Sequence, residues 1–460
     1  MNLRARTALV SLLLTSVPAA AQDAEKIAGF VRTEMTAQKI PGVAVAVIRK
    51  GQPIVVEGFG LANVEHAVRV TPDTIFQSGS VGKQFTSALV MLLVEEGRIA
   101  LNDPLTKYFP DAPAQWQRIT VRHLLTHTSG LPDYTAGTID YRRDYTEDEL
   151  QKFAYGLTPE FEPGARWNYS NTGYVLLGII VHKASGQFYG DLLRERVFSP
   201  LGMKSARIIT EEDIVPHRAG GYRLVRGELK NQQWVAPRLN TTADGSLYLS
   251  LRDFIAWDAA VSAGRVLSAA SWAQVFAPVT LNSGKTYPYG FGWNVEAVAG
   301  HRAQRHGGSW QGFQTYIARY PDDDFSVLVL SNLAQGNPER IADGVAALVN
   351  PALANPPLAE IADADPETQA LVRRLIGEAA RGNLSPAEFA YVRAGFFPGG
   401  AAAYAAALKD AGPVLRLTLL ERRELGDDRI YTYDVGFAEK TMRLRLALAP
   451  DGKIAQFSLR

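Results

Sequence analysis

Ser80 and Lys83 are the residues of this sequence whose types and spacing best fit nucleophilic chemistry. Side chains three residues apart share one face of a helix, so the lysine amine can reach the serine oxygen. A stripe of apolar residues with helical periodicity follows, and it consists of Phe85, Ala88, Leu89, Leu92 and Leu93 before a stop at Gly97. The pattern predicts that Ser80 lies in the first turn of a helix, where free backbone N–H groups favour a developing oxyanion.

Two further groups of polar residues follow the serine–lysine pair. Trp167–Asn171 (WNYSN) contains a Tyr-x-Asn pattern, and His306–Ser309 (HGGS) places a basic residue before two glycines. Serine with lysine, then Tyr-x-Asn, then a basic residue followed by glycine is the order of motifs in serine β-lactamases and penicillin-binding proteins.

The surrounding sequence also resembles this superfamily, especially its class C β-lactamase, esterase and D-aminopeptidase branches. The matching stretches are His123–Tyr134 (HLLTHTSGLPDY), Phe161–Gly164 (FEPG) and Tyr289–Trp293 (YGFGW). The resemblance covers roughly residues 25–350. It implies an α+β fold, an α/β sandwich in which an antiparallel sheet is flanked by helices. The active site would lie in the cleft between the sheet and a helical subdomain.

The base that activates the nucleophile stays open at this stage. A serine hydroxyl such as that of Ser80 does not ionise at neutral pH and needs an adjacent base. Lys83 is near enough, but a lysine with an ordinary pKa of about 10.4 is protonated, and only burial or a neighbouring positive charge would lower that pKa. By resemblance to the class C-like branches, Tyr169 is the other candidate, which helps to deprotonate the serine and later activates the deacylating water.

Other residues take binding roles by resemblance. Asn171 would bond both Lys83 and the amide of the substrate. Tyr134 and Trp310 directly follow motif residues, and each either lines the rim of the site or packs in the core.

The strand that carries His306 departs from the usual pattern of the superfamily. By resemblance, the backbone N–H groups of Ser80 and Ser309 form the oxyanion hole, and Gly307 and Gly308 let the substrate approach the strand closely. The superfamily usually has Lys-Thr-Gly here. A histidine with a pKa near 6.5 is mostly neutral at pH 7, so it anchors a substrate carboxylate less well than lysine does. This change argues against efficient turnover of cephalosporins or D-Ala-D-Ala peptides.

Two other groups resemble functional motifs and are interpreted as structural. Lys285–Tyr287 begins like Lys-Thr-Gly but lacks the glycine, and we expect it in a loop. His123 and His127 are four residues apart, but the glutamate of H-E-x-x-H and a third ligand are missing. We therefore expect neither a metal nor a cofactor.

The elements that position these residues follow from hydrophobic patterning. Strands are expected at 43–48, 54–56, 315–320 and 325–330, a helix at 338–349, and short helical patterns between loops over 105–280. Strands at both ends with helices between them predict an antiparallel sheet flanked by helices, formed by residues 22–350.

A second unit follows a linker rich in proline and alanine at 351–366. Residues 367–460 are predicted to form a small α+β accessory domain. Its helices are expected at 366–381, 386–394 and 400–410, and its strands at 413–422, 428–436, 441–449 and 453–459. The unit has no S-x-x-K motif and no histidine, so we assign it no chemistry. Its open roles are shaping substrate access, self-association and contact with the cell wall.

Composition and the first residues limit the chemistry, the partners and the cellular location that this protein can have. The chain has no cysteine, which excludes disulfides, thiol catalysis and thiolate metal sites. A formal net charge of +1 without a basic cluster argues against a nucleic-acid partner. Arg4 and Arg6, an apolar run from Ala8 to Val17, and Ala19–Ala21 indicate a signal peptide over residues 1–21. The run is too short for the roughly 20 residues of a membrane span. We expect an exported, soluble protein, most simply in a bacterial periplasm.

Together these observations predict a serine hydrolase that acts through a Ser80 acyl-enzyme. Short acyl esters, small amides or D-amino-acid peptides are the expected substrates. A β-lactamase or D,D-carboxypeptidase is the nearest alternative. A non-catalytic relative that binds a ligand or mediates assembly is an alternative of another class.

Overall fold

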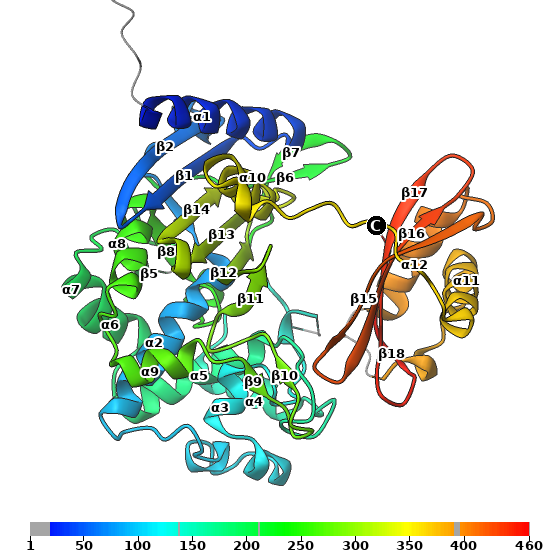
Figure 1. The fold of residues 1–460 in the computed structure, drawn as a ribbon. Helices are drawn as coiled ribbons and strands as arrows, with labels where there is room; N and C mark the ends of the chain where they lie inside the picture. Colours follow the sequence, from blue (N-terminus) through cyan, green and yellow to red (C-terminus); the bar gives the residue numbers. More distant parts are fainter. Residues whose placement is uncertain (1–18, 137–138, 210–211, 391–395, 460) are drawn as a thin grey trace, which may run out of the picture.

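The computed structural model describes residues 19–136, 139–209, 212–390 and 396–459. In this part of the chain, an antiparallel main sheet of seven strands has the order β11-β12-β13-β14-β1-β2-β3 (Figure 1). Its strands are β1 (Gly42–Arg49), β2 (Gln52–Asn63), β3 (Val68–Arg69), β11 (Asn294–Val298), β12 (His301–Trp310), β13 (Phe313–Tyr320) and β14 (Phe325–Ser331). β1 pairs with β14, so strands from both ends of this unit meet at the centre of the sheet. The predicted α+β architecture is confirmed.

Alternation along β1 places its side chains in two different cores. Val43, Val45 and Val47 belong to the core formed with α1 (Ala19–Gln38) and α10 (Pro338–Val349) on one face of the sheet. Ala44 and Ala46 belong to the larger core formed with the helical region on the other face. Small side chains on that face leave room for the helices that carry the site.

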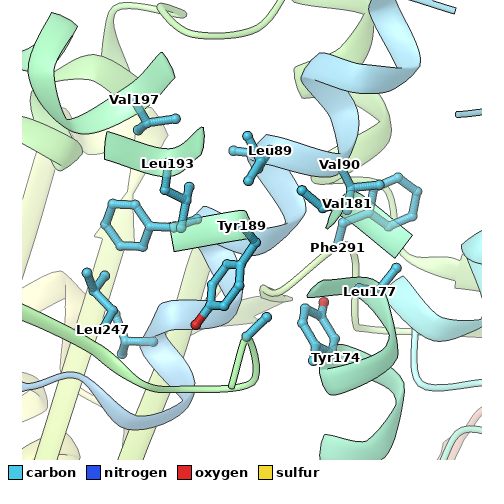
Figure 2. Close-up of a cluster of buried hydrophobic side chains, with 14 of the residues drawn as sticks. Leu89, Val90, Tyr174, Leu177, Val181, Tyr189, Leu193, Val197, Leu247 and Phe291 are labelled. Atoms are coloured by element: carbon cyan, nitrogen blue, oxygen red, sulfur yellow. The ribbon is translucent and has the colours of Figure 1, made fainter. Parts of the chain in front are cut away.

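The helical region is built around α2 (Lys83–Glu95), most of whose residues are buried. The other helices of this region are α3 (Val121–Leu125), α4 (Glu147–Tyr155), α5 (Asn171–Ser185), α6 (Tyr189–Leu193), α7 (Ser199–Leu201), α8 (Leu251–Ser262) and α9 (Ala269–Val275). Figure 2 shows Leu89 of α2 facing side chains of α6, and Val90 of α2 near Val181 of α5. Because α2 is packed on several sides, its first residue, Lys83, has a fixed position.

The turn before α2 differs from the prediction. Ser80 lies in a 3₁₀ turn, Gly79–Gly82, and the α-helix begins only at Lys83. Short strands complete the unit: β4 (Ile75–Gln77) and β5 (Arg207–Ile208) flank β8 (Leu247–Ser250), β6 (Tyr222–Val225) pairs with β7 (Glu228–Asn231), and β9 (Val279–Thr280) pairs with β10 (Thr286–Tyr287). The expectation that Lys285–Tyr287 lies in a loop was therefore wrong for its last two residues.

A separate domain follows at the C-terminal end (Figure 1). Its sheet has the order β15-β16-β17-β18, and its core includes residues of a long helix. The elements are α11 (Pro366–Arg381), α12 (Ala401–Leu408), β15 (Arg416–Leu425), β16 (Asp428–Gly436), β17 (Thr441–Leu448) and β18 (Ile454–Leu459). The strands agree with the predicted ones to within three residues. Of the helix expected at 386–394, residues 386–388 form a 3₁₀ turn, and 391–394 lie outside the described residues.

Two expectations concern the N-terminal end and the membrane. Residues 1–18 of the predicted signal peptide lie outside the described residues, while residues 19–21 begin α1. Among the helices of the described ranges, none has both the length and the apolar character that a membrane span requires.

Candidate active site

Ser80 lies where the turn before α2 meets strand β12 of the main sheet. Gly79 has a φ of +53°, and a Cβ there would lie 2.3 Å from the backbone nitrogen of Ser309. A Cβ on Gly308 would lie 2.0 Å from the carbonyl oxygen of Ser78 and 3.0 Å from the backbone nitrogen of Ser80. Only glycine permits this approach of two backbones. The backbone amides proposed for the oxyanion hole therefore come from segments that touch.

The ammonium or amine group of Lys83 has three neighbours that accept hydrogen bonds. Its Nζ lies 3.1 Å from Ser80 Oγ and 2.6 Å from Asn171 Oδ1, and it also bonds the carbonyl oxygen of Asp244. Asn171 is in turn held by its Nδ2, which donates to Asp133 Oδ2 at 3.0 Å. The structure thus brings together three of the residues singled out in the sequence: Ser80, Lys83 and Asn171.

Burial makes the neutral form of Lys83 more accessible. The side chain is fully buried, which lowers its pKa to about 8, although the carboxylates of Asp244 and Asp133 act in the opposite direction. A neutral amine has two N–H groups and one lone pair. With both N–H groups donated to Asn171 and Asp244, the lone pair points toward the Ser80 hydroxyl. This arrangement suits a base that accepts the serine proton.

Burial has the opposite effect on the pKa of Tyr169, which it raises. The residue is half-buried, but its hydroxyl is buried; this desolvation raises the pKa of Tyr169 well above the usual value, while the nearby Ser80 hydroxyl acts in the lowering direction. Lys83 Nζ lies 5.0 Å from the centre of the tyrosine ring. The hydroxyl has no well-formed hydrogen bond among the described residues. A phenol that keeps its proton at neutral pH can donate a hydrogen bond or pass on a proton, but it is a poor first base.

A chain of hydrogen bonds connects β12 to the segment of Tyr169. His306 Nδ1 lies 2.6 Å from the carbonyl oxygen of Gly307, and His306 Nε2 lies 2.9 Å from Tyr289 Oη. Tyr289 Oη lies 3.2 Å from His127 Nε2, and the backbone N–H of Ser170 donates to His127 Nδ1 at 3.1 Å.

The groups at the two ends of this hydrogen-bond chain fix which atom donates and which accepts in each of its bonds. A carbonyl only accepts and a backbone N–H only donates, so His306 carries its proton on Nδ1 and His127 carries its proton on Nε2. Burial, followed by the charge of Lys83, lowers the pKa of His306 to about 4 and that of His127 well below its usual value. Both rings are therefore neutral at pH 7, and Tyr289 donates to His306 while it accepts from His127. The His127 ring also packs on Tyr169, with 4.2 Å between ring centres.

The pocket in front of Ser80 has a volume of about 130 Å³. Five of the residues singled out in the sequence line it, namely Ser80, Tyr134, Asn171, Ser309 and Trp310, together with Gly79, Thr135, Thr242, Asp244, Gly245 and Ser246. Tyr134 is nevertheless 3% exposed, and its hydroxyl donates to Asp244 Oδ2 at 3.0 Å. His306 and Gly307 are not part of the pocket wall. His306 is 4% exposed, so the structure places it behind the site.

Sequence reasoning missed Asp133, Asp244 and Tyr289 as residues of the site. Asp133 and Tyr289 lie within stretches that carry the family resemblance, whereas Asp244 is in a loop without a recognisable motif. The pair His123 and His127 does not share a helix face. His123 caps α3 with Thr120, and His127 has a φ of +58° in the turn beyond it. In the described part of the chain, no group of three or more His, Asp or Glu side chains is placed to hold a metal ion.

Comparison with known proteins agrees with this geometry. A family model described as Beta-lactamase matches residues 27–350. Penicillin-binding protein 4* of Bacillus subtilis is 33% identical over 291 residues, which cover 60% of this chain and 64% of that protein. A D-aminopeptidase of Brucella anthropi is 31% identical over 327 residues, which cover 69% of this chain and 61% of that protein. The chain thus spans less than two thirds of the length of these relatives.

Solved structures with the same fold include two that differ in how much of this chain they cover. The octameric penicillin-binding protein homologue from Pyrococcus abyssi has a TM-score of 0.65 at 24% identity, covering 95% of this chain and 99% of that one. The D-amino acid amidase from Ochrobactrum anthropi SV3 has a TM-score of 0.61 at 27% identity, covering 72% of this chain and 97% of that one. Because the family model spans more than half of the chain, this chain belongs to the beta-lactamase family, within the superfamily of penicillin-binding proteins.

Proposed function

We propose that this protein hydrolyses small amides, D-amino-acid peptides or short acyl esters through an acyl-enzyme on Ser80, and that it prefers acyl groups with a free amine. The observation that carries the proposal is the environment of Lys83. Its amine is 3.1 Å from Ser80 Oγ, is fully buried, and has its other hydrogen-bonding positions occupied by Asn171 and Asp244. A non-catalytic relative has no need for such a base.

The reaction then proceeds by acyl transfer in two steps. Neutral Lys83 takes the proton of Ser80 as Oγ attacks the carbonyl carbon, and the backbone N–H groups of Ser80 and Ser309 hold the oxyanion. The bond to the leaving amine or alcohol breaks as the leaving group receives that proton, directly or through Tyr169. Water then attacks the carbonyl carbon of the acyl-enzyme and loses a proton to Lys83. Lys83 returns a proton to Ser80 Oγ as the bond between Oγ and the acyl carbon breaks and the acid leaves.

Asp244 supports a preference for substrates with a free amine. It lines the pocket beside Ser80 and is 8% exposed, and its Oδ1 has no hydrogen-bond partner among the described residues. Burial raises the pKa of this carboxyl, against the charge of Lys83. A buried carboxylate oxygen without a donor is costly, and a substrate ammonium would satisfy it. The names of the D-aminopeptidase and D-amino acid amidase relatives agree with this class of substrate.

The same features disfavour β-lactams and D-Ala-D-Ala peptides. Their carboxylate would meet the negative charge of Asp244 near the pocket. The strand position that holds a lysine in many penicillin-recognising relatives holds His306, which is neutral at pH 7 and lies outside the pocket wall.

Matched substrates test the proposal. D-alanine p-nitroanilide should be hydrolysed faster than its L enantiomer and faster than its N-acetyl derivative, which lacks the positive charge. Intact-protein mass should show an acyl adduct that is absent from Ser80→Ala. Equal rates for the free and acetylated amines would remove the role of Asp244. Rapid turnover of benzylpenicillin would establish the β-lactamase alternative, and no Ser80-dependent adduct with any of these compounds or with p-nitrophenyl acetate would leave only a non-catalytic role.

We also propose that the protein is exported. The support is the charged start, apolar run and Ala19–Ala21 at the beginning of the sequence. In a bacterial host, the periplasmic fraction should contain a chain that begins at Gln22. Recovery of the chain only from the cytoplasm with residues 1–21 intact would contradict export.

A further inference from the structure

The C-terminal domain contacts the catalytic domain through the turn between β15 and β16, residues 424–428. The chain enters this turn at the end of β15 that points toward β9 and β10 (Figure 1). Gly426 has a φ of +58°, and a Cβ there would lie 3.0 Å from Leu281 Cδ1 and 3.5 Å from the ring of Tyr287. The backbone of the turn thus lies directly against the β9–β10 hairpin.

Two ion pairs of different character join this turn to the catalytic domain. Arg166 Nη2 donates to Asp428 Oδ1 at 2.7 Å and to Oδ2 at 2.8 Å, and the two side chains are only 18% and 20% exposed. Lys285 and Glu424 form the second pair at 2.8 Å, with side chains 46% and 67% exposed. An exposed ion pair contributes little to stability. Breaking a mostly buried pair is more costly, because it leaves an uncompensated charge away from water.

Arg166 directly precedes the segment that carries Tyr169 and Asn171. Trp167 stacks on Tyr287 with ring centres 4.3 Å apart and planes 9° from parallel. The indole also lies next to the site, since its centre is 6.4 Å from that of Tyr169 and 6.1 Å from that of His127. A layer of side chains therefore runs from the β15–β16 turn to Tyr169.

We propose that Asp428 is a positioning residue of the active site, through which the C-terminal domain holds the Tyr169 segment in its working geometry. The described pocket wall contains no residue of the C-terminal domain, so this domain acts through Arg166 and not by touching the substrate there. Asp428 holds Arg166 by two hydrogen bonds directly before the segment Trp167–Asn171. The turn packs on Tyr287, which stacks on Trp167. The proposal rests on the proposed Ser80 chemistry.

The test compares substitutions in the two ion pairs by single-turnover kinetics. The rate of Ser80 acylation by p-nitrophenyl acetate is measured for the wild-type protein, Asp428→Asn, Glu424→Gln and the charge swap Arg166→Asp with Asp428→Arg. Asp428→Asn should slow acylation about tenfold at saturating substrate, because small displacements of positioned groups cost one to two orders of magnitude. KM should change little, since the pocket wall is intact. Glu424→Gln should match the wild type, and the charge swap should recover most of the loss.

Each result separates this inference from the proposed function. If the wild type forms no Ser80 adduct, the proposed function fails. If the wild type reacts and folded Asp428→Asn reacts equally fast, the positioning role is wrong. A folded charge swap that stays as slow as Asp428→Asn would also overturn it. Should Asp428→Asn fail to fold, the charge swap carries the decision by the same comparison with the wild type.

Discussion

Replacing Lys83 by glutamine is expected to lower kcat/KM roughly a thousandfold, the middle of the range for loss of a positioned acid–base group. Glutamine keeps hydrogen bonds to Asn171 and Asp244 within reach but offers no amine lone pair to Ser80. Lys83→Arg should be as damaging, because arginine keeps the charge and does not lose its proton. The rates are to be measured with D-alanine p-nitroanilide and p-nitrophenyl acetate.

The pH profile of the wild type provides the companion measurement. Lys83 must be neutral to act, and burial lowers its pKa to about 8. Below that pH the protonated form dominates, so kcat/KM should fall about tenfold for each pH unit on the acid side and level off above about 8. His306 and His127 are already neutral there and should add no step near pH 6.5. An acid limb that persists unchanged in Lys83→Gln would assign it to another group.

Tyr289→Phe is expected to reduce both stability and activity, because it removes the central member of the chain between β12 and Ser170. His306 Nε2 loses its donor and His127 Nε2 loses its acceptor. Each buried group left without a partner costs about 1–3 kcal/mol. We expect a lower midpoint of thermal unfolding and a loss of about tenfold in kcat/KM, since the Tyr169 segment is no longer held to β12.

A second tyrosine supplies the matched control. Tyr189 is 2% exposed, and its hydroxyl has no hydrogen bond to the described residues. Tyr189→Phe deletes the same atom from a buried ring without breaking a chain of hydrogen bonds, so its stability and kinetics should stay close to those of the wild type. Equal behaviour of the two variants would show that the His306–Tyr289–His127 chain has no positioning role.

Much of the architecture follows from local patterns. The apolar runs at residues 43–48 and 325–330 predict strands, and both segments are central strands of the main sheet. The helix expected at 338–349 is α10. The start of α2 was misplaced because its stripe of apolar residues does not distinguish a 3₁₀ turn from the first turn of an α-helix. Hydrophobic periodicity also could not reveal the strand at Thr286–Tyr287, because two residues are too few to show a repeat.

The sequence by itself determined which residues are available for the chemistry and which of them are neighbours. The three-residue spacing of Ser80 and Lys83 places amine and hydroxyl together in any helical turn, and two glycines before Ser309 permit close backbone contact. These properties are local, so they can be read from short segments.

Only the tertiary structure decided how those residues are charged and held. The pKa of Lys83 depends on burial and on Asp244 and Asp133, and the proton of His127 lies on Nε2 because the backbone N–H of Ser170, 43 positions away, donates to Nδ1. The contact of Asp428 with Arg166 joins residues 262 positions apart. Electrostatic energy depends on distance in space and on exclusion of water. No local pattern contains that information, and the fold supplies it by bringing distant segments together.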